Sequence, residues 1–201
     1  HGGDPSARAA LRLALSVLLR LLAPVLPYTE AVIVRATRID EAFLAMAPEL
    51  RIVARHGVGY DAVDVPALTR RGIPLTVTPD ANAVSVAEHA MMLLLAVARR
   101  VKDYDAATRA LEWGPRESLP TFDLAGRTLL VVGFGRIGAR TARLAAAFGM
   151  RVLVHDPYVP ANTVKGAGFT PAKTLAAGLA EADAVTLHCP SNAETRGLVD
   201  K

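Results

Sequence analysis

One stretch, Leu129–Gly138, constrains the fold of this chain more than any other. Its first four residues are aliphatic, and they lead directly into a G-x-G-x-x-G pattern. The pattern consists of Gly133, Gly135 and Gly138. Residues 136–148 follow with apolar side chains at helical spacing, and residues 151–155 form a second short apolar run. This order predicts a parallel β-α-β unit in which the glycines form the turn between strand and helix.

Each glycine of this turn has a physical role in binding a dinucleotide. Gly133 permits the tight turn, Gly135 lets a pyrophosphate approach the backbone, and Gly138 lets the helix lie close to the strand. The free N–H groups at the helix N-terminus would stabilise the phosphates. Asp156 ends the second strand, where its carboxylate can accept hydrogen bonds from ribose hydroxyls and repel a 2′-phosphate. The pattern therefore favours NAD over NADP; the alternative is a glycine-rich turn in an α/β protein that binds no nucleotide.

Short apolar runs and helical patterns alternate along most of the chain. We predict strands at residues 31–35, 51–55, 73–77, 128–132, 151–155 and 184–188. We predict helices at residues 7–22, 40–50, between Asp64 and Gly72, and at residues 83–100, 136–148 and 172–180. Asp40 and Asp64 are expected to be the N-cap residues of the second and third of these helices. No first strand is recognisable in residues 1–30. Alternation at these spacings predicts an α/β fold with two parallel-sheet domains of the Rossmann or flavodoxin type.

The domain boundary is predicted near residue 100, because the sequence becomes more polar after it. The helix expected over residues 83–100 is apolar on most faces, so we expect it to be buried between layers. Its neighbouring residues Glu88 and His89 do not face each other on a helix. We therefore interpret them as structural polar groups at the domain junction and not as an acid/base pair.

Composition excludes several classes of protein. The 201 residues carry a net charge of +4 and are 52% hydrophobic, which fits a globular chain with a substantial core. Its arginines are scattered and not clustered on one segment, so we expect no nucleic-acid partner. The apolar stretches at residues 11–26 and 83–97 are too short for a membrane span and contain charged residues. We predict a soluble protein.

Cys189 is the single cysteine of the sequence, so no intramolecular disulfide can form. This fits a reducing compartment and predicts a cytoplasmic location. His155, His188 and Cys189 do not form a metal set, because His188 and Cys189 are neighbours on a strand end and point to opposite faces. We predict no metal site.

Several stretches, in this order and spacing, resemble the D-isomer-specific 2-hydroxyacid dehydrogenases, the family that includes phosphoglycerate dehydrogenase. The resemblance covers about residue 31 to the end. Its stretches are residues 51–61 (RIVARHGVGYD), 63–64, 72–79 (GIPLTVTP), 81–83, 87–89, 132–138 (VGFGRIG), 148–152, 156–158 (DPY), 188–190 (HCP) and 194–198 (ETRGL).

The resemblance implies two α/β domains, a substrate-binding domain over residues 1–100 and an NAD-binding Rossmann domain over residues 101–201. It implies that the backbone of Val58 and Gly59 holds the substrate carboxylate, with Asn82 nearby. The positions that it implies for the cofactor are Thr78, Gly133, Gly135, Arg136, Ile137, Gly138, Asp156, Cys189 and Pro190. From the residues alone, Val58 and Gly59 could equally form an ordinary turn, and Asn82 could be a helix cap.

The family's hydride transfer uses an Arg, a His and a Glu that match no residue of this chain, so we expect no catalytic group here. We therefore expect a C-terminally incomplete NAD-binding domain, an unpaired edge on the last strand, and a fragment of an enzyme that interconverts a D-2-hydroxy acid and its 2-oxo acid. At full length we expect a homodimer or larger assembly. The alternative is a non-catalytic NAD-binding regulatory or interaction protein derived from the same family.

Overall fold

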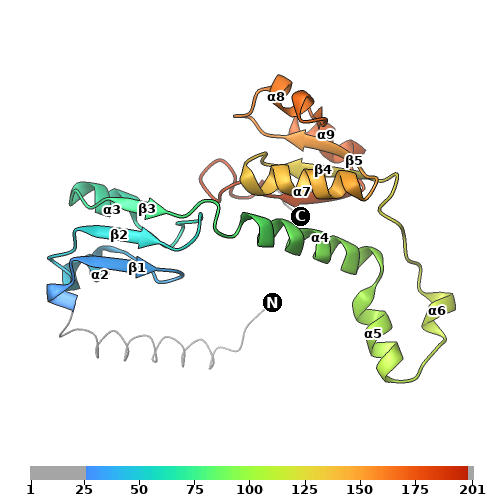
Figure 1. Ribbon diagram of the computed structural model, residues 1–201, viewed down its shortest axis with the longest axis horizontal. Helices are drawn as coiled ribbons and strands as arrows, with labels where there is room; N and C mark the ends of the chain where they lie inside the picture. The colour runs from blue at the N-terminus through green and yellow to red at the C-terminus, as the bar shows by residue number, and fades with distance from the viewer. Residues whose placement is uncertain (1–25, 199–201) are drawn as a thin grey trace. The chain divides into compact units, whose positions relative to one another are not determined.

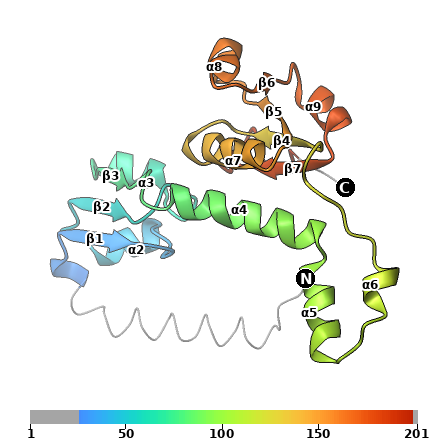
Figure 2. The ribbon, with the colours of Figure 1, turned by 45° about the vertical axis from the view of Figure 1, so that its right-hand side comes forward.

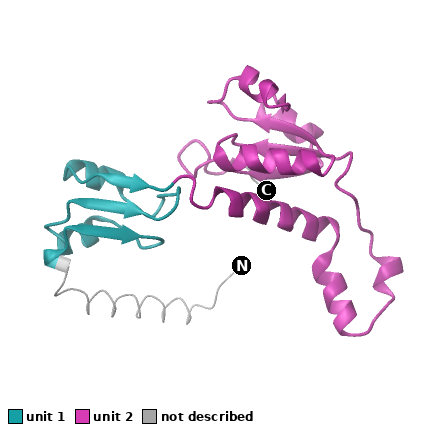
Figure 3. Ribbon diagram, in the orientation of Figure 1, with its two compact units in different colours: residues 1–78 teal, residues 79–201 magenta. Residues whose placement is uncertain are grey.

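The computed structural model describes residues 26–198, and the chain divides into two compact units, residues 1–78 and 79–201 (Figures 1 and 3). Each unit contains a parallel sheet with helices, as the sequence predicts. The helix predicted over residues 7–22 lies outside the described residues. The division lies before the predicted position near residue 100, because the helix that follows residue 78 packs within the second unit.

The first unit is built on a three-stranded parallel sheet in the order β1-β2-β3. Its elements are η1 (Leu26–Tyr28), β1 (Ala31–Val34), α2 (Glu41–Met46), β2 (Ile52–Arg55), α3 (Val65–Arg70) and β3 (Leu75–Val77). An aspartate is the N-cap residue of both α-helices, as predicted. The Asp40 carboxylate accepts from the Phe43 N–H at 3.1 Å, and the Asp64 carboxylate accepts from the Ala67 N–H at 2.9 Å.

Helix α2 is shorter than the prediction, which extended it to about Leu50. It ends at Met46 because Pro48 follows, and the residue before a proline is disfavoured in helical conformation. Its buried Phe43 and Leu44 pack with Val53 of β2 in the core of this unit. Ile33 of β1 is 80% exposed, so β1 is not the fully buried strand that its composition predicts.

The second unit contains a four-stranded parallel sheet in the order β6-β5-β4-β7 (Figure 2). Its strands are β4 (Thr128–Val132), β5 (Arg151–His155), β6 (Thr170–Pro171) and β7 (Ala184–Leu187). Its helices are α4 (Ala83–Ala98), α5 (Val101–Arg109), α6 (Pro115–Ser118), α7 (Arg136–Ala147), α8 (Ala161–Gly166) and α9 (Leu175–Glu181). Strand β7 lies at the end of the sheet, so among the described residues one of its edges pairs with no strand, as predicted.

Alternate residues of β4 face two different cores. Leu129 and Val131 pack with residues of α4 and α7 on one face of the sheet. Leu130 and Val132 pack on the other face, where Leu175 of α9 covers them. All five residues of β4 are buried, which explains why the four residues after Thr128 are a continuous apolar run.

Helix α4 differs from the prediction in extent and in burial. It ends at Ala98, because Arg100 adopts a left-handed conformation (φ 48°) before α5 begins. It is also not buried on most faces, because four of its large apolar residues are about half-exposed or more: Val84, Met92, Leu93 and Val97. The apolar content of the helix predicts burial, but its buried Met91 and Ala98 pack with residues of β4 and α7 while other apolar side chains stay exposed.

The remaining helices of the second unit are short. No periodic pattern in the sequence indicates α5, α6, α8 or the two-residue strand β6, so the sequence does not predict these elements. Among residues 26–198, no helix has both the length and the apolar content needed to cross a bilayer.

Asp183 connects the starts of β4 and β7, and its ionisation is expected to contribute to the stability of the sheet. Its carboxylate accepts from the Thr128 N–H at 2.8 Å and from Arg127 at 2.9 Å. These two hydrogen bonds lower the pKa of Asp183 from its ordinary value of 3.8. A lowered folded-state pKa stabilises the fold above pH 3.8, and this contribution is lost as the pH falls through the folded-state pKa.

We predict that Asp183→Asn lowers the urea midpoint of unfolding at pH 6, and that the difference from wild type shrinks as the pH falls below 4. Asp105→Asn is the matched control, because Asp105 pairs with Arg109 on the surface of α5. Its midpoint should stay near that of wild type. Equal effects of the two variants at pH 6 would contradict this account of Asp183.

Candidate cofactor-binding site

The glycine turn follows β4 and is closed by contacts that leave no room for side chains at two of its positions. Gly133 has a φ of 91°, and a Cβ there would lie 2.8 Å from the backbone N of Cys189. A Cβ on Gly138 would lie 1.9 Å from the carbonyl oxygen of Gly133. The first turn of α7 therefore lies directly against the end of β4, as the sequence predicts.

Gly135 is different, because the protein itself does not require a glycine there. Its φ is −76°, and a Cβ added to it would meet no atom within 4 Å. It is the N-cap residue of α7, and no side chain caps that helix. The space beside Gly135 at this helix end is therefore open, and the helix dipole favours an anion there.

Asp156 follows β5 and is fixed against the glycine turn. One carboxylate oxygen accepts from the Phe134 N–H at 2.7 Å, and the other accepts from the Tyr158 N–H at 2.9 Å. The side chain is half-buried. A carboxylate has about four acceptor positions, so two remain for the hydroxyls of a ribose.

The end of β7 forms the other side of the turn. The backbone of His188 and Cys189 lies against Gly133, so Cys189 borders the glycine turn, and Pro190 is the next residue along the chain. The imidazole of His188 lies 3.0 Å from the Thr186 hydroxyl, and burial lowers its pKa from the ordinary value of 6.5. His188 is therefore a neutral, packed side chain at neutral pH.

Arg136 and Asn82 lie at the starts of two helices of the second unit. The guanidinium of Arg136 pairs with Asp80 at 2.9 Å, which ties the segment before α4 to the start of α7. Both side chains of this pair are more than half-exposed. Asn82 is the N-cap residue of α4, but its side chain makes no capping hydrogen bond. The amide of Asn82 is therefore not committed to the helix.

The remaining predicted residues belong to the first unit. Val58 and Gly59 lie in the exposed turn after β2. Thr78 lies beside this turn, because its hydroxyl accepts from the Gly57 N–H at 2.8 Å, and the Thr78 N–H donates to the Gly57 carbonyl at 3.1 Å. Thr78 thus orders the turn that carries Val58 and Gly59.

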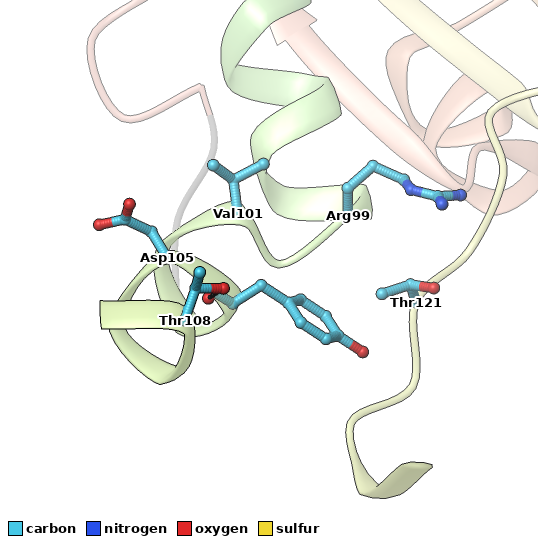
Figure 4. Close-up of a pocket in the computed structure, with 6 residues that line it drawn as sticks. Arg99, Val101, Asp105, Thr108 and Thr121 are labelled. Carbon is cyan, nitrogen blue, oxygen red and sulfur yellow. Dashed lines mark hydrogen bonds between the residues drawn. The ribbon is translucent and has the colours of Figure 1, made fainter. Parts of the chain in front are cut away.

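The second unit also contains two hollows, the second of which reaches His188 beside the glycine turn. One, of about 490 Å³, is lined by residues of α5 and by Thr121 (Figure 4). Its charged residues already have partners, since Arg99 pairs with Asp123 and Asp105 with Arg109. The other, of about 480 Å³, is a mostly apolar groove between α4 and β7. Its polar lining includes His89 and His188.

No group of three or more His, Cys, Asp or Glu residues within the described part of the chain could hold a metal ion. The contacts that sequence analysis missed are those of Asp80, Tyr158 and Glu194. Tyr158 donates its phenol hydrogen to the carboxylate of Glu194, although the two residues are 36 positions apart. A contact over that separation leaves no local pattern in the sequence.

Comparison with known proteins decides the family. Residues 91–201 match the NAD binding domain of the D-isomer specific 2-hydroxyacid dehydrogenases. The chain belongs to this family. It therefore carries the family's NAD-binding domain on a Rossmann-type parallel sheet, and NAD is its cofactor.

The chain is similar in sequence and in structure to known dehydrogenases. The chain is 46% identical over 185 residues to D-3-phosphoglycerate dehydrogenase of Mycobacterium leprae, covering 90% of this chain and 34% of that protein. It thus spans about a third of the length of this curated relative. Among solved structures it is similar to D-lactate dehydrogenase from Aquifex aeolicus complexed with NAD and lactic acid. That match has a TM-score of 0.79 and 31% identity, and covers 86% of this chain and 52% of the other.

A further structural neighbour is an acyclic imino acid reductase (Bsp5) in complex with NADPH and D-Arg. The match has a TM-score of 0.76 and 25% identity, and covers 86% of this chain and 55% of that one. The two neighbours share the fold with this chain but were solved with different nicotinamide cofactors. The choice between NAD and NADP must therefore depend on local residues and not on the fold.

The geometry of the glycine turn predicts opposite effects of two substitutions on stability. Gly138→Ala places a methyl group against the Gly133 carbonyl, so we expect the free energy of unfolding to fall by about 3 kcal/mol. Gly135→Ser places a capping side chain in open space, so we expect a change within about 0.5 kcal/mol. Urea unfolding followed by circular dichroism measures both. A Gly135→Ser protein as unstable as Gly138→Ala would contradict this assignment.

Proposed function

We propose that this chain is the cofactor-binding part of an NAD-dependent oxidoreductase that interconverts a D-2-hydroxy acid and its 2-oxo acid, similar to phosphoglycerate dehydrogenase. Its membership of the family and its identity to D-3-phosphoglycerate dehydrogenase support this proposal. The strongest structural support is the open space at Gly135, the N-cap residue of α7, where no side chain caps the helix. A capping side chain would stabilise that helix, and its absence leaves the position free for a phosphate.

The cofactor site that we propose consists of the glycine turn and the residues around it. The N–H groups of Arg136 and Ile137 bind the pyrophosphate, and Asp156 accepts hydrogen bonds from the adenosine ribose. Cys189 and Pro190 border the cofactor on the β7 side, and Thr78 is a further residue that we propose for cofactor binding. When bound, the nicotinamide supplies the hydride acceptor or donor.

For the substrate we propose a small 2-hydroxy or 2-oxo acid. The backbone N–H groups of Val58 and Gly59 would bind its carboxylate, because successive N–H groups in a turn form an anion-binding concavity. Thr78 supports this role by fixing the adjacent Gly57 through two hydrogen bonds. We propose Asn82 as a third substrate-binding residue, because its side-chain amide makes no capping hydrogen bond to α4.

We also propose that the natural protein is a cytoplasmic homodimer or larger assembly. The exposed apolar side chains of α4 favour association, because such a set would otherwise face water. The single cysteine fits a reducing compartment.

The activity is tested by the oxidation of NADH, followed at 340 nm, with a panel of 2-oxo acids and the intact natural protein. We expect turnover with at least one of them and loss of activity when Gly59 is replaced by proline, which removes one N–H of the carboxylate site. NADH binding without turnover on any 2-oxo acid would instead support a non-catalytic NAD-binding regulatory role.

The role of Asp156 in cofactor choice is tested by titrating NADH and NADPH into the protein and following nicotinamide fluorescence. Wild type should bind NADH more tightly than NADPH. Asp156→Ala should reduce the ratio of the two affinities by about tenfold, because the variant loses both the ribose acceptor and the negative charge. Gly135→Ser should weaken both cofactors by more than about tenfold, because its side chain occupies the place of the phosphate. Equal affinities of wild type for NADH and NADPH would contradict the assignment of Asp156.

A further inference from the structure

Tyr158 and Glu194 connect the loops on either side of the glycine turn. The phenol O–H of Tyr158, just after β5, donates to the carboxylate of Glu194, in the loop after β7. Strand β4 lies between β5 and β7 in the sheet. Because all three strands are parallel, their carboxyl ends share one edge. The hydrogen bond therefore spans the edge at which the glycine turn lies.

This connection continues to the ribose-binding carboxylate. Asp156 accepts from the N–H of Tyr158, and its other oxygen accepts from the N–H of Phe134 in the glycine turn. A single chain of hydrogen bonds thus links the glycine turn, Asp156, Tyr158 and Glu194. The carboxylate of Glu194 thus lies within one tyrosine side chain of Asp156, on the surface, where Tyr158 is 75% exposed.

The loop that carries Glu194 is ordered by its own hydrogen bonds. The Asn192 side-chain oxygen accepts from the N–H groups of Glu194 and Thr195, at 2.9 and 3.0 Å. The Thr195 hydroxyl donates to the Pro190 carbonyl at 2.5 Å. Glu194 therefore extends from a defined turn, which explains how its carboxylate can reach Tyr158.

Two negative charges act on the tyrosine. Its hydrogen bond to Glu194 raises the pKa of Tyr158 above its ordinary value of 10.0, with smaller contributions from the charges of Glu194 and Asp156. The phenol therefore remains a donor at neutral pH, and the charge of the cluster resides on the two carboxylates.

We propose that Glu194, positioned by Tyr158, is a second specificity-determining acid that disfavours the 2′-phosphate of NADP. This inference rests on the proposed function, in which the adenosine ribose lies at Asp156. A 2′-phosphate there would add two negative charges near both carboxylates. Because structural neighbours of the same fold were solved with NAD and with NADPH, such local charges must decide between the cofactors.

The test is a fluorescence titration of NADH and NADPH into the intact natural protein and three variants. Glu194→Gln keeps a hydrogen-bond acceptor for Tyr158 and removes the charge, so NADPH should bind about threefold more tightly at low salt while NADH affinity stays within about twofold. The gain should diminish towards about 0.5 M salt, because exposed charges are screened. Tyr158→Phe keeps the charge of Glu194 but removes the hydrogen bond that positions its carboxylate. The selectivity for NADH over NADPH should therefore also fall in this variant.

Glu181→Gln is the matched control. It removes the same charge from a pair with Arg151 at the first residue of β5, the opposite end of that strand from Asp156, and should leave both affinities unchanged. Selectivity that is the same in Glu194→Gln as in wild type, while NADH still binds, would overturn the role of Glu194 and leave the proposed function intact. Wild-type selectivity in Tyr158→Phe would overturn the positioning role of Tyr158. Absence of NADH binding in wild type would overturn the proposed function and this inference with it.

Discussion

The close contact between Gly138 and Gly133 is the constraint on which the cofactor site depends. It allows the first turn of α7 to lie against the end of β4, where a side chain would collide with a backbone carbonyl. This seating directs the uncapped N-terminus of α7 towards the carboxyl edge of the sheet. It also brings the Phe134 N–H to Asp156, so that the helix end and the acid are fixed relative to each other by one short segment.

The buried strand β4 connects the glycine turn to the other residues of the proposed site. Its two neighbours, β5 and β7, deliver Asp156 and Cys189 to the same edge because all three strands are parallel. Both faces of β4 are covered, so the strand cannot shift without disturbing two cores at once. A site built at such an edge is ordered before the cofactor binds, which reduces the conformational entropy cost of binding.

Sequence reasoning succeeded where the physical cause is local. The glycine turn, the capping aspartates Asp40 and Asp64, and the strands β4 and β5 each leave a short pattern, and each lies where it was predicted. Reasoning failed where the cause is tertiary. The exposure of Val97 depends on what packs against α4, and the hydrogen bond between Tyr158 and Glu194 depends on strand order. The residue roles taken from the family resemblance stay predictions.

The central claim is that the dinucleotide lies over the glycine turn of the second unit. A crystal structure of the intact natural protein with NAD tests it most directly. We expect the pyrophosphate within hydrogen-bond distance of the Arg136 and Ile137 N–H groups, above Gly135, and the adenosine ribose on Asp156. A dinucleotide bound elsewhere, with the turn empty, would contradict the claim.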